Sequence, residues 1–255
     1  MKKTKFAVLF TALMAVLGLS SCLGDPDPYY TGTEIMKIDG FTGFYSFKSA
    51  GGYTVNPTNS ELLTESLESG SFAYVTYKYD TRTVVQNSDK IDAEIQYLLP
   101  ISNITPYGET ESNAPMHTVS SESVKFFDKT NMFIDLTYYY ENSTDSEKLS
   151  EELKKHHFYL SKPMAEDGEE VDNKTLTLNL IHVVDDADNN EKRTSTGSET
   201  RHIDLSYFLE SETEKIVINF KQSSGSTIDD SAKDTKIEIN YKSIMDQYFN
   251  DNKTE

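Results

Sequence analysis

The sequence of 255 residues contains one cysteine and no tryptophan. A single cysteine excludes an internal disulfide, so the fold must be held together by burial of apolar side chains. The Gly-x-Ser-x-Gly, His-Glu-x-x-His, Walker and Cys-x-x-Cys motifs are all missing, and with them the strong sequence signals of catalysis. We therefore predict a protein that is not an enzyme and that needs no cofactor. The many carboxylates leave one alternative open, a hydrolase that acts on glycans by general acid–base chemistry.

Positive charge is scarce. There are 24 Lys and Arg against 42 Asp and Glu, a formal net charge of −18. Such a surface repels phosphate backbones, which argues against nucleic acid as a partner. It also repels anionic lipid head groups, so a basic patch is not what would hold this protein to a membrane.

Long apolar runs are also missing. The longest uncharged apolar run, Phe6–Leu19, is shorter than the roughly 20 residues that a membrane-spanning helix needs. Lys2, Lys3 and Lys5 precede it, and small residues follow it, which is the pattern of an export signal. We predict that residues 1–21 are a signal peptide. Its removal takes three lysines and leaves a net charge of about −21.

The signal ends in Leu19-Ser20-Ser21-Cys22, which resembles the lipobox of bacterial lipoproteins. That resemblance implies cleavage before Cys22 and acylation of its thiol and its new amine, for example with palmitate. Several acyl chains anchor a protein stably, whereas one does not. The alternative is a secreted protein in which Cys22 has no such role. Asp25 and Asp27 resemble, loosely, the acidic signals of surface lipoproteins in Bacteroidetes, so we expect an outer-membrane protein that faces the cell surface or the periplasm.

The mature chain starts with a segment rich in Pro, Gly and Asp, and we predict a flexible tether over residues 22–33. Sixteen Tyr and thirteen Phe favour β structure. Ser71–Tyr79 and Ile91–Leu99 alternate with a period of two, and shorter runs precede them. Five short strands in about 70 residues suit a small closed barrel. We predict an OB-like β-barrel domain over residues 34–106.

Periodicity stops in the polar segment 105–115 and resumes after it, so we predict a second domain over residues 116–255. Its most pronounced strand pattern is Met132–Tyr140, and Ser146–Lys155 has the spacing of a short surface helix. Seven or so short strands favour an antiparallel β-sandwich, which makes the whole chain all-β. Two acidic stretches, Glu166–Asn173 and Asp185–Arg201, are interpreted as loops that could meet a basic partner.

This layout resembles the NigD-like lipoproteins of Bacteroidetes. The resemblance rests on the lipobox, the acidic tether, the barrel-sized strand set, Met132–Tyr140, His157–Leu160 and Leu176–His182. It implies an N-terminal OB-like domain, a C-terminal β-sandwich domain and no established enzymatic activity. The helix-like insert at Ser146–Lys155 departs from the family. We expect a monomeric, lipid-anchored envelope protein that binds a protein, a peptide or a glycan.

Three groups of side chains were considered as sites. Asp186, Asp188 and Asn190 have the oxygen spacing that opens a calcium loop, but Glu191 occupies the place of the required glycine. A zinc site could be built from His157, His182 and Asp185, although strand histidines are usually structural. We predict no bound metal. Sugar-stacking candidates are Tyr74, Tyr77, Tyr79 and Tyr97, of which half or more must serve the barrel core.

Overall fold

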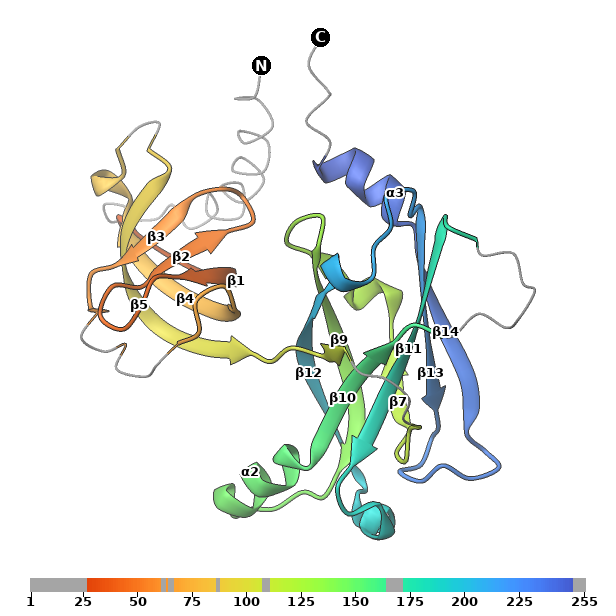
Figure 1. Cartoon of the computed structure of the whole chain (residues 1–255). Coiled ribbons are helices and arrows are strands. Elements are labelled where there is room, and N and C mark those ends of the chain that lie inside the picture. The colour runs from red at the N-terminus through yellow and green to blue at the C-terminus, as the bar shows by residue number, and fades with distance from the viewer. Residues whose placement is uncertain are drawn as a thin grey trace, which may run out of the picture. The chain divides into compact units, whose positions relative to one another are not determined.

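The structure, a computed structural model, describes residues 27–60, 63, 67–85, 88–106, 111–163 and 172–249. The predicted signal peptide, Cys22 and most of the acidic stretch Glu166–Asn173 lie outside the described residues. The described chain forms two compact units. The first contains the residues up to Gly70 together with Tyr74–Leu99, and the second contains Ser71–Ala73 and Pro100–Phe249. The fold is all-β in both units, as predicted (Figure 1).

The first unit is a closed barrel of five strands with the order β1-β2-β3-β5-β4. The β3–β5 pair is parallel and the β1–β2 and β2–β3 pairs are antiparallel. This is the strand order of an OB fold, in agreement with the prediction. The strands are β1 (Tyr29–Asp39), β2 (Ser46–Ser49), β3 (Thr54–Pro57), β4 (Phe72–Asp80) and β5 (Lys90–Ile101).

The predicted tether is too long at its C-terminal end, because β1 begins at Tyr29 rather than near residue 34. The segment is strand because it packs on β4. The rings of Tyr30 and Tyr79 have centroids 5.3 Å apart, and Thr33 Oγ1 lies 2.8 Å from Thr76 Oγ1. Gly32 contributes to this packing, since a Cβ atom there would lie 2.8 Å from the Tyr30 side chain.

The second unit is built on one nine-stranded sheet with the order β12-β9-β7-β13-β11-β10-β6, with β14 paired to β13 and β8 paired to β9. Its strands are β6 (Thr105–Pro106), β7 (Met116–Val119), β8 (Lys125–Phe126), β9 (Asn131–Tyr140), β10 (His156–Ser161), β11 (Thr175–Val184), β12 (Ser195–Asp204), β13 (Lys215–Gln222) and β14 (Lys233–Ile239). Its helical segments are η3 (Ser121–Ser123), α2 (Ser146–Lys154), η4 (Ala187–Lys192), η5 (Leu205–Tyr207), α3 (Tyr241–Ile244) and the π-helix η6 (Met245–Phe249).

The sheet curls until its two ends meet. β12 and β6 are at opposite ends of the strand order, yet His202 of β12 bonds the segment that leads into β6. Its N–H donates to Ser102 O at 3.0 Å, and its carbonyl accepts from Ile104 N at 2.8 Å. The curl buries one face of the sheet on itself, so the unit has the layered core of a sandwich.

The strand directions differ from the predicted antiparallel arrangement. The β11–β13, β7–β13 and β6–β10 pairs are parallel. Parallel neighbours need a long crossover connection. Here the chain leaves β11, crosses to the far end of the sheet as β12 and returns as β13. Such a pairing joins residues far apart in sequence, so strand patterns alone do not reveal it.

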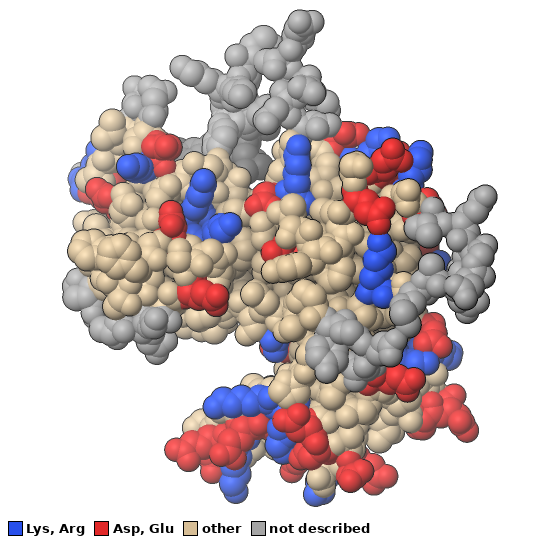
Figure 2. All heavy atoms as spheres, in the orientation of Figure 1, with Lys and Arg blue, Asp and Glu red and all other residues tan. Residues whose placement is uncertain are grey.

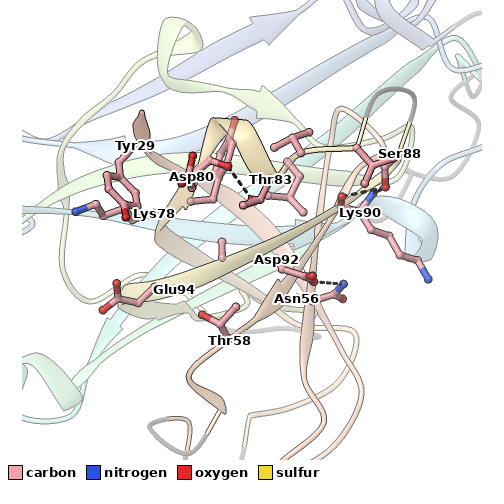
Figure 3. A pocket seen from close by; sticks show the side chains of 15 residues that line it. Tyr29, Asn56, Thr58, Lys78, Asp80, Thr83, Ser88, Lys90, Asp92 and Glu94 are labelled. Carbon is pink, nitrogen blue, oxygen red and sulfur yellow. Dashed lines mark hydrogen bonds between the residues drawn. The ribbon is translucent and has the colours of Figure 1, made fainter. Parts of the chain in front are cut away.

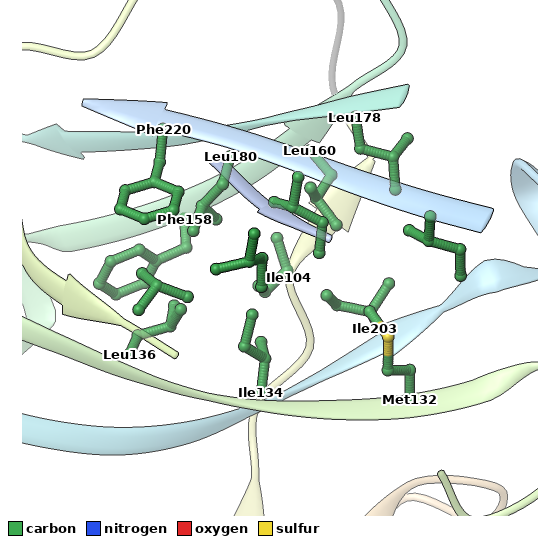
Figure 4. Close-up of a cluster of buried hydrophobic side chains, with 14 of the residues drawn as sticks. Ile104, Met132, Ile134, Leu136, Phe158, Leu160, Leu178, Leu180, Ile203 and Phe220 are labelled. Atoms are coloured by element: carbon green, nitrogen blue, oxygen red, sulfur yellow. The ribbon is translucent and has the colours of Figure 1, made fainter. Parts of the chain in front are cut away.

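The core of the second unit lies inside the curled sheet, on the inner faces of its strands (Figure 4). Ile134 and Leu136 of β9 and Leu178 of β11 are fully buried, and Leu160 of β10 is 1% exposed. Alternation along the strands sends every second side chain inward, as the pattern of β11 illustrates.

Two predicted boundaries are wrong. Residues 100–106 were assigned to the barrel domain and residues before 116 to a linker, but Ile104 is 3% exposed and belongs to the core of the second unit. The predicted loop Asp185–Arg201 is the short helix η4 followed by most of β12. β12 is polar in sequence because most of its side chains are not buried; it lies at one end of the strand order and pairs along its length with β9.

Candidate functional site

An open groove of about 770 Å³ runs along the outside of the barrel, beside the β4–β5 connection (Figure 3). Residues of β5 form one wall because successive side chains of a strand point to opposite faces. Ala93 is 1% exposed and faces the barrel core. Lys90, Asp92 and Glu94 are exposed and line the groove.

The neighbouring strand β3 supplies an amide. Asn56 lies opposite Asp92 in the parallel β3–β5 pair, and its Nδ2 donates to Asp92 Oδ1 at 3.1 Å. The bond engages one N–H of the amide and one oxygen of the carboxylate. Thr58 follows on the same strand side, where its backbone N–H donates to Ala93 O at 2.9 Å. The Asn56 amide and the Asp92 carboxylate are thus fixed side by side on two strands, and Thr58 follows directly after β3.

The β4–β5 connection forms the rim of the groove. Asp80 caps the 3-10 turn η2 (Thr81–Thr83) by accepting from Arg82 N at 2.9 Å, and it pairs with the Arg82 guanidinium. These hydrogen bonds from Arg82 hold the pKa of the Asp80 carboxyl below its usual range. Thr83 Oγ1 donates to Asp80 O at 2.8 Å. The start of the connection is therefore braced, while Val85 beyond it is 70% exposed.

An aromatic ring lies at the other end of the groove. Tyr29, the first residue of β1, is 50% exposed, and Lys78 Nζ lies 4.7 Å from its ring centroid. A cation in this position is attracted by the face of the ring. The groove therefore combines two tyrosine rings, of which Tyr29 is the exposed one, with two lysines, an amide, three carboxylates and hydroxyl groups, without one dominant sign of charge.

Of the four predicted stacking candidates, Tyr77 and Tyr79 are buried, at 3% and 8% exposed, although Tyr79 also borders the groove, and Tyr74 is half-buried. The Tyr77 hydroxyl donates to Glu34 Oε1 at 2.7 Å, which fixes it inside the unit. Tyr97 is 56% exposed but lies outside the groove. Sequence reasoning missed Tyr29, because the Pro-Gly context of this residue indicated a tether. The signal for a strand is that Tyr30, Gly32 and Glu34 are two residues apart, and in the structure all three face inward.

A second concentration of polar side chains is buried in the other unit. Arg193 is 2% exposed, its Nε donates to Glu152 Oε1 at 2.7 Å, and its Nη1 donates to Asn190 Oδ1 at 2.7 Å. Its Nη2 pairs with Asp186, which also accepts from Lys155 Nζ at 2.8 Å. Burial disfavours the Glu152 carboxylate, but the hydrogen bonds from Arg193 outweigh it and lower its pKa.

Two histidines extend this cluster into the core. His156 Nδ1 and His182 Nε2 are 3.0 Å apart, so one ring donates to the other. His156 Nε2 lies 3.4 Å from Glu152 Oε1, and His182 Nδ1 lies 3.3 Å from Pro115 O. Burial lowers the pKa of His156 to about 4 and that of His182 to about 3. Both rings are therefore neutral at pH 7.

The candidate metal ligands are engaged with other side chains or exposed. Asp186 and Asn190 bond Arg193, so a calcium ion would compete with a buried guanidinium, and Asp188 is exposed. His157 Nε2 is 2.9 Å from Asp185 Oδ1, but His182 is engaged with His156 instead. Within the described ranges, no group of three or more His, Cys, Asp and Glu is arranged to hold a metal ion. Cys22 lies outside the described residues.

Comparison with known proteins shows that solved structures share this fold. No protein-family model matches the sequence, and no curated protein matches it. Several solved structures are similar, among them the following three. A lipoprotein candidate from Bacteroides fragilis is 22% identical with a TM-score of 0.68, over 83% of this chain and 98% of that one. A protein described as toxin-related, from Parabacteroides distasonis, is 14% identical with a TM-score of 0.55, over 86% and 98%.

The third, a protein of unknown function from Bacteroides vulgatus, is 9% identical with a TM-score of 0.52, over 82% of this chain and 91% of that one. These likenesses establish the two-unit fold over nearly the whole described chain. In the part of the chain that the structure describes, no helix has the length and apolar character needed to cross a membrane.

Proposed function

We propose that this chain is a lipid-anchored envelope protein that binds a glycan in the barrel groove and does not turn it over. The observation that carries the proposal is the groove itself, in which Tyr29, Asn56 and Asp92 lie on rigid strands with exposed polar groups beside them. OB barrels commonly bind oligosaccharides or oligonucleotides on one side.

The mixed polarity of the groove favours a polyhydroxylated ligand. Each sugar hydroxyl both donates and accepts, so it needs acceptors such as Asp92 and Glu94 near donors such as Asn56 and Lys90. A sugar ring also has an apolar face that suits the exposed ring of Tyr29. A nucleic acid would require a positive surface, whereas this chain has a net charge of −18, and Figure 2 shows acidic and basic side chains interspersed over the visible face.

The anchor is the second part of the proposal. The export signal, the Leu19–Cys22 lipobox and the resemblance to NigD-like lipoproteins support acylation of Cys22. A solved structure with the same fold is described as a lipoprotein candidate of Bacteroides fragilis, which agrees with this location in the envelope. The outer membrane is the membrane we propose. In cells labelled with palmitate, a Cys22→Ala variant should lose both the label and the membrane association. Retention of either in the variant contradicts the anchor.

The groove can be tested with the soluble mature chain on a panel of envelope and dietary polysaccharides. Tyr29→Ala and Asp92→Ala should each weaken glycan binding at least tenfold, which corresponds to about 1.4 kcal/mol. Tyr97→Ala is the matched control, because Tyr97 is a tyrosine of similar exposure on β5 outside the groove.

Equal losses in the Tyr29 and Tyr97 variants would contradict the groove as the binding site. Glycan binding that is absent from the whole panel would contradict the ligand class. Release of shorter products from any bound glycan would contradict binding without turnover and would favour the carboxylate hydrolase. A basic protein partner loses its main support, because Asp185–Arg201 is not a loop.

A further inference from the structure

The second unit contains an open pocket of about 540 Å³ between α2, the start of β10 and Arg201 of β12. It belongs to a different unit from the barrel groove and is independent of the glycan proposal. Its charged lining residues are Lys154 and Arg201, joined by the histidines at 156 and 157, and no Asp or Glu lines it. In a chain with 42 acidic and 24 basic residues, a pocket without a lining carboxylate is an unusual environment.

The helix α2 turns its apolar side chains toward this pocket, whereas a helix with only a structural role would turn them toward the core. Its buried residue is Glu152, which is held by Arg193. Its two leucines, Leu149 and Leu153, are one turn apart on the same face and line the pocket instead. Leu153 is 39% exposed. A structural helix normally turns its leucines toward the core, so this face is apolar surface left open beside positive charge.

The positive groups are partly committed elsewhere. Arg201 Nη2 donates to Glu199 Oε1 at 2.9 Å, and its guanidinium lies 5.1 Å from the Phe158 ring centroid. Arg201 Nε is buried, and among the described residues it has no hydrogen-bond acceptor. His157 Nε2 lies 2.9 Å from Asp185 Oδ1 and is hydrogen-bonded to it. Lys154 is exposed and forms no ion pair within the described part of the chain.

A charged acceptor forms the strongest bond with a guanidinium, and the Arg201 side chain, which is 15% exposed, reaches the pocket. We propose that this pocket binds an anionic amphiphile, a molecule with a sulfate, phosphate or carboxylate head on an apolar chain. The head lies at Arg201 and Lys154, and the chain lies along Leu149 and Leu153. The leucines favour an apolar tail, and the cations attract a negatively charged head, give a neutral head no such attraction and repel a positive one.

The test uses three probes that separate these two contributions: octyl sulfate below its micelle concentration, octyl glucoside, and inorganic sulfate. Each is titrated into the isotope-labelled soluble mature chain and followed by NMR. Octyl sulfate should bind saturably and shift the signals of α2 and the start of β10. The other two probes should bind at least tenfold more weakly, because each lacks either the charge or the tail.

Two variants and a control locate the site. Lys154→Gln and Leu153→Ser should each weaken octyl sulfate binding at least tenfold. Both positions are exposed, so the chain should keep its fold, which circular dichroism checks. Lys148→Gln removes the same charge from the same helix outside the pocket and should leave binding unchanged.

Vesicles that contain phosphatidylglycerol distinguish a membrane lipid from a free amphiphile as the ligand. If they compete with octyl sulfate, the ligand is a lipid head group with its chain, and if they do not, it is a free amphiphile. The proposal is overturned if inorganic sulfate or octyl glucoside binds as tightly as octyl sulfate, or if Lys148→Gln weakens binding as much as Lys154→Gln.

Discussion

At the scale of single residues, Arg193 organises the irregular side of the second unit. Its guanidinium joins α2 through Glu152, the segment before η4 through Asp186, and η4 itself through Asn190. Asn190 Nδ2 in turn donates to Asn113 O at 3.0 Å. The segments between strands therefore depend on one buried positive charge for their arrangement.

Removing that charge should be strongly destabilising. In Arg193→Ala the buried Glu152 carboxylate loses its buried partner and keeps Lys155, whose Nζ lies 3.2 Å from Glu152 Oε2, and the loss of a buried partner costs about 3–5 kcal/mol. Urea unfolding followed by circular dichroism should record a decrease of this size in the free energy of unfolding. Arg82→Ala, which breaks the exposed pair with Asp80, is the matched control and should change stability little. Similar effects of both substitutions would mean that Arg193 is not a structural centre.

The neutral histidine pair makes stability depend on pH. The native pKa values of His156 and His182 are lowered to about 4 and about 3, whereas the unfolded chain has the usual value of about 6.5. Below pH 6.5 the unfolded state therefore binds more protons than the native state. Each histidine should lower the free energy of unfolding by up to roughly 1.4 kcal/mol per pH unit as the pH falls toward 4.

Urea unfolding at several values between pH 7 and pH 5 measures this slope, above the range in which most carboxylates titrate. The His182→Gln variant removes one titrating group and should have a shallower slope, even though it is less stable at pH 7. An unchanged slope would contradict the assigned protonation state of His182.

At the scale of elements, the β1–β2 connection illustrates how one backbone position sets a turn. Gly40 has a φ of +105°, and a Cβ atom there would lie 2.1 Å from Phe44 O. Gly43 in the same turn has a φ of +85°, but a Cβ atom would meet nothing within 4 Å. At Gly43 an added Cβ atom would therefore meet only an unfavourable backbone conformation, whereas at Gly40 it would also overlap a neighbouring atom.

Alanine at each position should reveal the difference. Gly43→Ala should cost about 1–2 kcal/mol for its positive φ alone. Gly40→Ala should cost a further 1–3 kcal/mol or so, because Phe44 and the turn must move to admit the methyl group. Thermal unfolding of the two variants, compared with the parent chain, tests this order. The reverse order would contradict the turn geometry.

The leucine spacing of the helix α2 predicts that a helix forms but not which of its residues is buried. The spacing of Leu149 and Leu153 predicts a helix near Ser146–Lys155, and the structure confirms it at Ser146–Lys154. Asp145 begins the helix by accepting from Glu147 N at 3.0 Å. The pattern does not reveal that Glu152 is the buried residue of this helix. That choice depends on Arg193, which lies far away in sequence and has no local signal.

At the scale of the whole molecule, each unit has its own core. Val55 and Val75 are buried in the barrel, and Leu178 is buried in the curled sheet. Leu178→Ala should destabilise the second unit by about 2–5 kcal/mol, as core truncations do. Hydrogen exchange followed by mass spectrometry should become faster in β9–β13 and stay unchanged in β2–β4. Val75→Ala, the matched substitution in the barrel, should produce the opposite pattern. Equal acceleration in both units would mean that they unfold together.

The sequence by itself determines the all-β class, the five barrel strands and the helix α2, because these depend on alternation and spacing within about ten residues. The export signal and lipobox are equally local, and the acylation of Cys22 stays a prediction. Tertiary structure alone decides the parallel pairings, the closure at His202, the membership of Ile104 in the second core, and the burial of Arg193 in a segment that reads as a solvated loop. It also decides the groove, which Tyr29, Asn56 and Asp92 line together. The physical reason is the same in each case: these residues are far apart in sequence, and only the folded chain places them in one sheet, one core or one groove.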